Sequence, residues 1–288
     1  MGGDWLVWQL IDSAFPTGGF VHSGGLETAA QAGLIYDGKS LEQYLQEQLN
    51  QTASTTMKVA VSAHRALDKS QPFDSNFAAF AEVDRLMQAM TTNHVANRAS
   101  RAQGMALLST AASCLAESEL GAYKRAIYFS TPSLYGHYAP VFGLVCKMLD
   151  VPLETTKQMF LFVVLRSLIS SAVRLNLTGP LEGQRLQLRC STYAEALLER
   201  DAKNEAKATT ATQRLRKEEE ELARMKEEME HKMSEDQDHE AALKVDTKVM
   251  KKKETFDLPP DHDCYQTSPL LDLVQGMHDR LYSRLFNT

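Results

Sequence analysis

The sequence predicts an all-α protein, a single-domain multi-helix bundle that contains one charged insertion. Apolar residues recur at spacings of three and four along most of the chain, which is the period of an amphipathic helix. No run alternates between apolar and polar residues between hairpin turns, as a half-buried strand would. With 288 residues and 43% hydrophobic side chains, the chain can also bury a sizeable core.

The first two predicted helices flank a loop that is rich in glycine. Trp5 and Trp8 begin an apolar helical face that ends at residues 15–19, where proline and glycine break the pattern. A short helix is expected over about residues 24–32, and Gly33 is well placed to stop it. The glycines of the loop suit a tight turn with positive φ.

Longer helices follow in the first half of the chain. Ser40 and Gln43 have the spacing of a capping box, which predicts that a long helix opens there. Another helix is expected to start at Asp74, with large apolar side chains along one face. Residues 94–115 are rich in alanine, serine and glycine, and we expect helices there that pack closely together.

The second half is expected to contain the centre of the core. Residues 135–140 break the helical pattern, and Pro152 then opens the most hydrophobic helix, over about residues 153–176. At the end of the chain, Pro269 opens a final helix that we expect to reach Phe286.

Residues 201–255 differ in composition from the rest of the chain. They contain 15 acidic and 13 basic side chains and no aromatic one. The acidic run 218–221, followed by Lys226, supports a solvated helix with ion pairs between neighbouring turns. Leu215, Leu222 and Met229 recur at a spacing of seven, which is too few repeats for a coiled coil, where three or four full heptads are expected. We therefore predict a charged, partly disordered helical insertion between a first domain part at 1–200 and a C-terminal part at 256–288 that completes the domain.

Charge and cysteine content argue against several classes of protein. The formal net charge is -6 and the pI about 5.8, whereas a nucleic-acid-binding domain usually has a pI above about 9. Four cysteines lie far apart, which fits reduced thiols in a cytosol. No signal-peptide pattern is present, and the longest apolar run, residues 159–165, is far shorter than the roughly 20 residues that span a bilayer. We expect a cytoplasmic protein that binds neither nucleic acid nor membrane.

Three segments together form a distinctive pattern. Residues 10–27 contain a Pro-Thr-Gly-Gly-Phe loop that leads through a serine to the helix start Gly-Leu-Glu. Residues 167–186 contain Ser-Ala-Val-Arg and then Gly-Gln-Arg. Residues 268–286 begin with Ser-Pro-Leu-Leu and end with Tyr-Ser-Arg-Leu-Phe. Weaker markers lie between them, an Arg-Ala-Ser-Arg motif at 98–101 and a Gly-His pair at 136–137.

In the order and spacing of these motifs the chain resembles the UreF family of urease accessory proteins. The resemblance covers about residues 4–200 and 265–288, and it is interrupted by the charged insertion. A second departure is Pro180, since family members often place a proline earlier after the motif that contains Arg174. The resemblance implies an adaptor, a nickel metallochaperone scaffold, and not an enzyme. UreF-like proteins form a homodimer, bridge the accessory protein UreD (also called UreH) and the GTPase UreG, and help to deliver nickel into apo-urease in metallocentre assembly.

The resemblance also implies two partner-binding sites. The residues expected to face UreG are Pro16, Phe20, His22, Glu27 and Arg174. The residues of the final helix expected to dock UreD are Leu281, Tyr282, Arg284, Leu285 and Phe286. In the docking set, the apolar side chains would share one helical face, and the tyrosine and the arginine would supply polar contacts.

Several of these residues have a purely structural alternative. The glycine loop can present Phe20 and His22 as interface anchors, or it can simply form a tight turn. Glu27 lies near a helix N-terminus, where a carboxylate is favoured in any case and can act as a cap. Arg174 lies in the most apolar helix, so it needs a carboxylate such as Glu27 or access to solvent. It is either a structural ion-pair residue or one that restrains GTP hydrolysis by UreG.

No metal site, cofactor site or catalytic centre is predicted. His22 and His137 form no cluster in sequence, and a lone histidine is more often a hydrogen-bonded core residue than a ligand. Residues 261–264 combine three ligand types, but extended neighbours in a linker cannot enclose a metal alone. No motif of a catalytic triad is present, and the glycine loop lacks the lysine of a phosphate-binding loop.

Two other functions stay open from the sequence. The protein could act mainly as a regulator of the UreG GTPase, without a direct role in nickel transfer. It could also be a helical enzyme that binds an apolar ligand in its core, which requires a deep closed pocket lined by Arg174.

Overall fold

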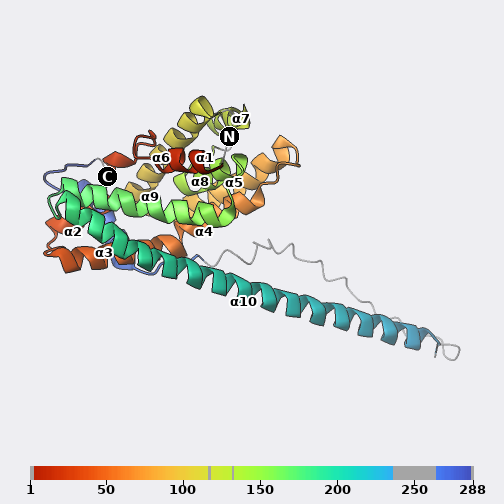
Figure 1. Ribbon diagram of the computed structural model, residues 1–288. Helices are drawn as coiled ribbons and strands as arrows, with labels where there is room; N and C mark the ends of the chain where they lie inside the picture. Colours follow the sequence, from red (N-terminus) through yellow and green to blue (C-terminus); the bar gives the residue numbers. More distant parts are fainter. Residues whose placement is uncertain (1–2, 116–117, 132, 236–263, 287–288) are drawn as a thin grey trace. The chain divides into compact units, whose positions relative to one another are not determined.

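A computed structural model describes residues 3–115, 118–131, 133–235 and 264–286 (Figure 1). Within these ranges the chain forms helices and loops and no strand, which confirms the all-α prediction. In chain order the helices and 3-10 turns are α1 (Gly3–Ile11), η1 (Gly19–Val21), α2 (Leu26–Gln31), α3 (Gly38–Ser54), α4 (Thr56–Ala66), α5 (Phe73–Met90), α6 (His94–Cys114), α7 (Ser118–Phe129), α8 (Tyr138–Met148), α9 (Leu153–Arg174), α10 (Pro180–Glu235), α11 (Pro269–Gly276) and η2 (Met277–Arg280).

The described residues fall into two compact units. The first contains the residues up to 198 together with those from 264 onward, and the second begins at Glu199. In the second unit the chain continues as helix to Glu235, with an ion pair of 3.7 Å between Glu199 and Lys203 on successive turns. The rest of the insertion predicted from the sequence, residues 236–255, lies outside the described residues, as do 261–263 of the linker motif.

The core of the first unit lies where α4, α8 and α9 meet. α4 packs against α8, α9, α5 and α3, and α8 also packs against α6. Gly143 permits the close approach of α8 to α4, since a Cβ atom there would lie 2.1 Å from the carbonyl oxygen of Ala60. Between α8 and α9 the rings of Phe142 and Phe160 meet edge to face, with centroids 5.2 Å apart.

The most hydrophobic predicted helix is α9, which begins at Leu153 and ends at Arg174, close to the expected bounds. Figure 1 shows it running beside α4, and it packs on both α3 and α4. Among the described residues it is the one helix long and apolar enough to cross a membrane by length and composition. However, 56% of its most apolar window is buried inside the protein. The core helix of a soluble protein has the same character, so this is weak evidence for a membrane span.

The start of α3 differs from the prediction. The helix begins at Gly38, and its N-cap is Asp37 rather than Ser40. The Asp37 carboxylate accepts the backbone N–H of Ser40 at 2.7 Å, and the Ser40 hydroxyl accepts the backbone N–H of Asp37 at 3.0 Å. The capping box is therefore real but lies three residues earlier, because the aspartate uses the serine as its third helical residue.

The prediction of a final helix that reaches Phe286 is wrong. α11 ends at Gly276, a 3-10 turn follows over Met277–Arg280, and residues 281–286 are not helical. The backbone N–H groups of Leu285 and Phe286 donate to a side chain of another element instead of to carbonyls one turn earlier. Leu281, Leu285 and Phe286 consequently do not share a helical face.

Candidate functional site

The glycine loop before α2 is held against α3 and α11. Gly24 and Gly25 have φ of 62° and 86°, which confirms the predicted positive-φ turn. The carbonyl oxygen of Gly24 accepts hydrogen bonds from the Tyr44 hydroxyl at 3.0 Å and from Gln48 Nε2 at 3.1 Å, both on α3. A Cβ atom on Gly25 would lie 3.1 Å from Cβ of Gln275 on α11. The loop therefore has little freedom to move.

The loop residues expected to face UreG differ in their exposure. Pro16 lies at the surface. His22 is half-buried, and burial lowers its pKa to about 4, with further contributions from the charges of Arg98 and His278. His22 is thus neutral at physiological pH. The side chain of Phe20 lies outside the part of the chain that can be described.

Glu27 binds the end of the chain. It lies in the first turn of α2 and is 2% exposed. Its carboxylate accepts the backbone N–H groups of Leu285 at 2.5 Å and of Phe286 at 3.1 Å. Glu27 therefore does not cap its own helix. It holds residues 277–286, which we call the C-terminal segment.

A buried histidine completes this contact. His278 is fully buried, and its Nε2 lies 3.2 Å from the carbonyl oxygen of Phe286. Since a carbonyl only accepts, Nε2 carries the proton and donates. The other ring nitrogen, Nδ1, lies 3.9 Å from the Glu27 carboxylate and has no hydrogen-bond partner among the described residues. Glu27 and His278 together bind both backbone groups of Phe286.

Arg174 contacts the same residue from α9. Its guanidinium carbon lies 4.4 Å from the centre of the Phe286 ring, a cation–π geometry. Burial lowers the pKa of Arg174, but a guanidinium stays charged in proteins. The hydrogen bonds of the Glu27 carboxylate go to the C-terminal segment rather than to Arg174. The two residues meet instead through Phe286.

The five residues expected to dock UreD differ in their exposure. Phe286 is 4% exposed and packs into the protein's own core. Tyr282 is fully exposed, Leu285 is 61% exposed, and Arg284 also faces solvent, while Leu281 is half-buried. The structure thus brings together Glu27 and Arg174 of one predicted site with Leu285 and Phe286 of the other.

Asp279 fastens the C-terminal segment to α6 and was missed from the sequence. Its carboxylate accepts from Arg98 at 2.9 Å, from His94 at 3.1 Å and from Arg284 at 3.4 Å. These bonds, that of Arg98 above all, hold the pKa of Asp279 below its usual value. The only sequence signal was the Arg-Ala-Ser-Arg motif that begins at Arg98, and nothing local connects it with a residue 181 positions later.

A cavity of about 560 Å³ adjoins this site. Its walls include His22, Gln48, Arg166, Arg174 and Gln275, and Glu27 is not among them. Arg174 lines this cavity, as the enzyme alternative required, but that alternative also required a deep closed pocket, and the lining alone does not separate it from an adaptor. Within the described ranges no three histidine, cysteine or acidic side chains lie together as a metal site would need.

His137, the other histidine singled out from the sequence, is a hydrogen-bonded core residue. It is fully buried, with Nε2 2.8 Å from Gln88 Oε1 and Nδ1 3.1 Å from the Ser100 hydroxyl. Burial lowers its pKa, and the nearby Asp84 partly opposes that shift. The neutral ring therefore serves as a structural link between α5 and α6.

Comparisons with known proteins identify relatives of this chain. The family model UreF matches residues 35–191. The urease accessory protein F of rice (Oryza sativa subsp. japonica) is 31% identical over 284 residues, which is 99% of this chain and 85% of the relative. That of Arabidopsis thaliana is 32% identical over 282 residues, 98% of this chain and 91% of the relative. The urease accessory protein UreF of Arthrobacter sp. (strain FB24) is 32% identical over 192 residues, 67% of this chain and 80% of the relative.

The all-helical fold and these relatives define the class of the protein, an accessory protein with a role in urease maturation. The relatives are accessory proteins rather than enzymes, which weighs against the enzyme alternative. Because the family model covers more than half of the chain and the plant relatives nearly all of it, the chain belongs to the UreF family.

Proposed function

We propose that this protein is a nickel metallochaperone scaffold that bridges UreD (UreH) and the GTPase UreG and helps to deliver nickel into apo-urease. In this proposal the exposed part of the C-terminal segment docks UreD, and the glycine loop with Glu27 and Arg174 faces UreG. The protein acts as a cytoplasmic homodimer, has no catalytic activity or cofactor of its own, and contacts neither nucleic acid nor membrane.

One observation supports the proposal most directly, namely that the two sets of partner residues meet. Glu27 and His278 bind the backbone of the C-terminal segment, and Arg174 stacks on its last described side chain. Tyr282 and Leu285 on the same segment point to solvent. A partner that engages these exposed side chains therefore touches a segment whose removal would uncover Glu27 and Arg174, which gives the bridge a physical basis.

A pull-down with purified UreD, UreG and GTP tests the proposal. Deleting residues 277–288 should abolish UreD binding and leave a helical protein, because the docking residues are removed. Phe20→Ala should weaken UreG recruitment by about 1–3 kcal/mol, the usual range for the loss of an aromatic interface anchor, and leave UreD binding intact. Phe129→Ala, at an aromatic residue on α7 that is 76% exposed, is the matched control and should change neither.

Two results of this experiment would refute the assignments. If the truncated chain binds UreD with unchanged affinity, the C-terminal segment is not part of the UreD interface. Unfolding of the Phe20→Ala variant, or UreG recruitment equal to that of wild type and of the Phe129→Ala control, would show that the loop has only a structural role.

The alternative function is regulation of UreG GTPase activity, as an activator or as a restraint, without a direct role in nickel transfer. The position of Arg174 at the edge of the candidate site favours testing it. Arg174→Ala should alter GTP turnover in the assembled complex. If nickel transfer from UreG no longer needs this protein once nucleotide turnover is held constant, a regulator of UreG is the better description. If nickel transfer still needs the protein under that condition, a metallochaperone scaffold is the better description.

A further inference from the structure

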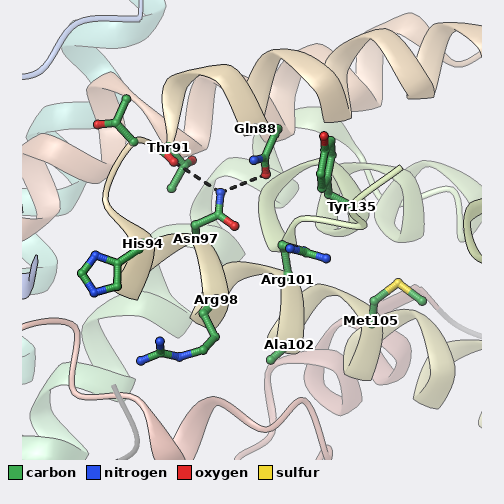
Figure 2. A pocket seen from close by; sticks show the side chains of 10 residues that line it. Gln88, Thr91, His94, Asn97, Arg98, Arg101, Ala102, Met105 and Tyr135 are labelled. Atoms are coloured by element: carbon green, nitrogen blue, oxygen red, sulfur yellow. Dashed lines mark hydrogen bonds between the residues drawn. The ribbon is translucent and has the colours of Figure 1, made fainter. Parts of the chain in front are cut away.

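A second hollow lies between α5 and α6 and borders the C-terminal segment, since His94 and Arg98 in its lining bind Asp279. It has a volume of about 820 Å³, and we call it the α5–α6 groove. The side chains that matter are Gln88 on α5, Asn97, Arg98 and Arg101 on α6, and Tyr135 in the loop before α8. Figure 2 shows both arginines projecting from α6, with Tyr135 above Arg101 in this view.

The groove is basic in an acidic protein. Its lining contains His94, Arg98 and Arg101 and no carboxylate, although the chain as a whole has a net charge of -6. His94 and Arg98 are already bound to Asp279. Arg101 differs from them, because in the described ranges no acidic side chain pairs with it. A guanidinium held at a groove without a counter-charge is a receptor for a carboxylate, which it binds through two parallel N–H donors.

The fold fixes the position of Arg101. Its guanidinium carbon lies 5.3 Å from the centre of the Tyr135 ring. Tyr135 is in turn held by Asp84 on α5, whose carboxylate accepts the backbone N–H groups of residues 135–137 at 2.7, 3.1 and 2.9 Å. Gly104 lets this loop approach α6, since a Cβ atom there would lie 2.1 Å from the carbonyl oxygen of Gly136. The loop that carries Tyr135 is therefore fixed, and the ring contact orients the exposed Arg101 side chain along it.

The floor of the groove offers a hydrogen-bond donor beside an acceptor. Gln88 Oε1 accepts from His137 Nε2 at 2.8 Å and from Asn97 Nδ2 at 2.9 Å, and Asn97 Nδ2 also donates to the carbonyl oxygen of Thr91 at 3.3 Å. These bonds fix both amide orientations, as the dashed lines of Figure 2 show for Asn97. Gln88 Nε2 and Asn97 Oδ1 are left without a partner among the described residues. Such a donor–acceptor pair complements a peptide group.

We propose that the α5–α6 groove binds an acidic, extended peptide segment of a partner protein. A carboxylate of the segment lies on the Arg101 guanidinium, and a backbone amide of the segment pairs with Gln88 and Asn97. Phosphate fits less well, because the Asn97 oxygen would face its oxygens as one acceptor against another. The contacts with Arg101, Gln88 and Asn97 use none of the residues of the two partner sites proposed above, although His94 and Arg98 in the same lining hold Asp279 of the C-terminal segment.

The test uses the full-length chain and a defined probe, the acetylated and amidated peptide Gly-Glu-Glu-Leu-Glu-Gly with a fluorescent label. Fluorescence anisotropy gives its affinity, and side-chain signals of isotope-labelled arginine in NMR spectra locate the contact. Arg101→Gln should weaken binding about tenfold or more, because a charge-assisted bidentate contact is lost. Arg101→Lys should restore part of the affinity, since it keeps the charge but not the fork. Arg185→Gln, at an exposed arginine on α10, is the charge-matched control and should bind like wild type.

Comparison peptides separate the sources of the charge. A peptide with glutamine in place of glutamate should not bind. An unlabelled Gly-Gly-Gly-Leu-Gly-Gly peptide with a free C-terminus tests whether a terminal carboxylate suffices, and either carboxylate source agrees with the proposal. Saturable binding with shifts at Arg101, and none at Arg185, is the expected result. The proposal is overturned if the acidic peptide does not bind, if Arg101→Gln binds as well as wild type, or if inorganic phosphate binds more tightly than the peptide.

Discussion

The contact of Glu27 with the C-terminal segment leads to a quantitative prediction for Glu27→Gln. The carboxylate accepts two backbone N–H groups in a buried site. A glutamine of the same shape can accept only one of them, and its NH₂ group would face the other donor. A hydrogen bond to a charged group contributes about 1.5–3 kcal/mol. The free energy of opening the C-terminal segment should therefore fall by about this amount while the rest of the fold stays intact.

Amide hydrogen exchange measures that opening. Since about 1.4 kcal/mol corresponds to a factor of ten, exchange at Leu285 and Phe286 should accelerate by roughly 10- to 150-fold in Glu27→Gln. The control is Glu42→Gln, which removes a surface ion pair of 3.1 Å with Arg189 and should leave those amides unchanged. Equal exchange rates in wild type and Glu27→Gln would refute the reasoning. Acceleration spread over α4 and α8 would mean that the variant had loosened the whole fold.

Three further predictions concern stability. Burial depresses the pKa of His22 from 6.5 to about 4, so the folded chain binds fewer protons than the unfolded chain in this range. The Tm of the protein should therefore be highest with respect to this group above pH 6.5 and fall as the pH falls towards 4. In the His22→Asn variant Tm should depend less on pH, and Tm curves that run parallel for the variant and the wild type would contradict the lowered pKa of His22. Gly104→Ala should lower the free energy of unfolding by about 1–3 kcal/mol or more, because the added Cβ would overlap the Gly136 carbonyl. The control Gly38→Ala, where nothing lies within 4 Å of the added Cβ, should not lower it, and equal Tm values for the two variants would refute the close contact at Gly104. Replacing residues 205–250 by a Gly/Ser linker should change Tm little, since the segment has few apolar side chains to pack, and a large loss would show that it packs on the body.

Local patterns in the sequence were enough to predict much of the architecture. α9 lies close to its expected bounds because its apolar residues and the preceding Pro152 are local signals. The positive φ values of Gly24 and Gly25 follow from the glycine content of one short loop. His137 was weighed as a core histidine on chemical grounds, and it is one. The first two features depend on residues that are neighbours in the chain, whereas the prediction for His137 followed from the chemistry of a lone histidine.

The features that the sequence did not reveal depend on contacts between distant residues. The chain is not helical up to Phe286, and the backbone N–H of Phe286 donates instead to Glu27, 259 residues earlier. Asp279 accepts a hydrogen bond from Arg98, which lies 181 residues earlier in the chain, and helical periodicity does not indicate such a pair. The amphipathic helix expected for the C-terminal segment did not form. Phe286 is buried without a helix, whereas Leu285 beside it is 61% exposed.

The buried carboxylate also sets a condition on how the C-terminal segment can meet UreD under the proposed function. If UreD takes the segment out of its place, wild-type affinity is reduced by the small fraction of molecules in which the segment is open. Glu27→Gln raises that fraction and should then tighten UreD binding by up to the same factor by which it accelerates exchange. If UreD instead docks on Tyr282 and Leu285 with the segment in place, the variant offers a less ordered surface and should bind more weakly. The sign of this change, measured beside the Glu42→Gln control, therefore distinguishes release from docking in place, and an unchanged affinity would exclude any coupling between Glu27 and the UreD interface.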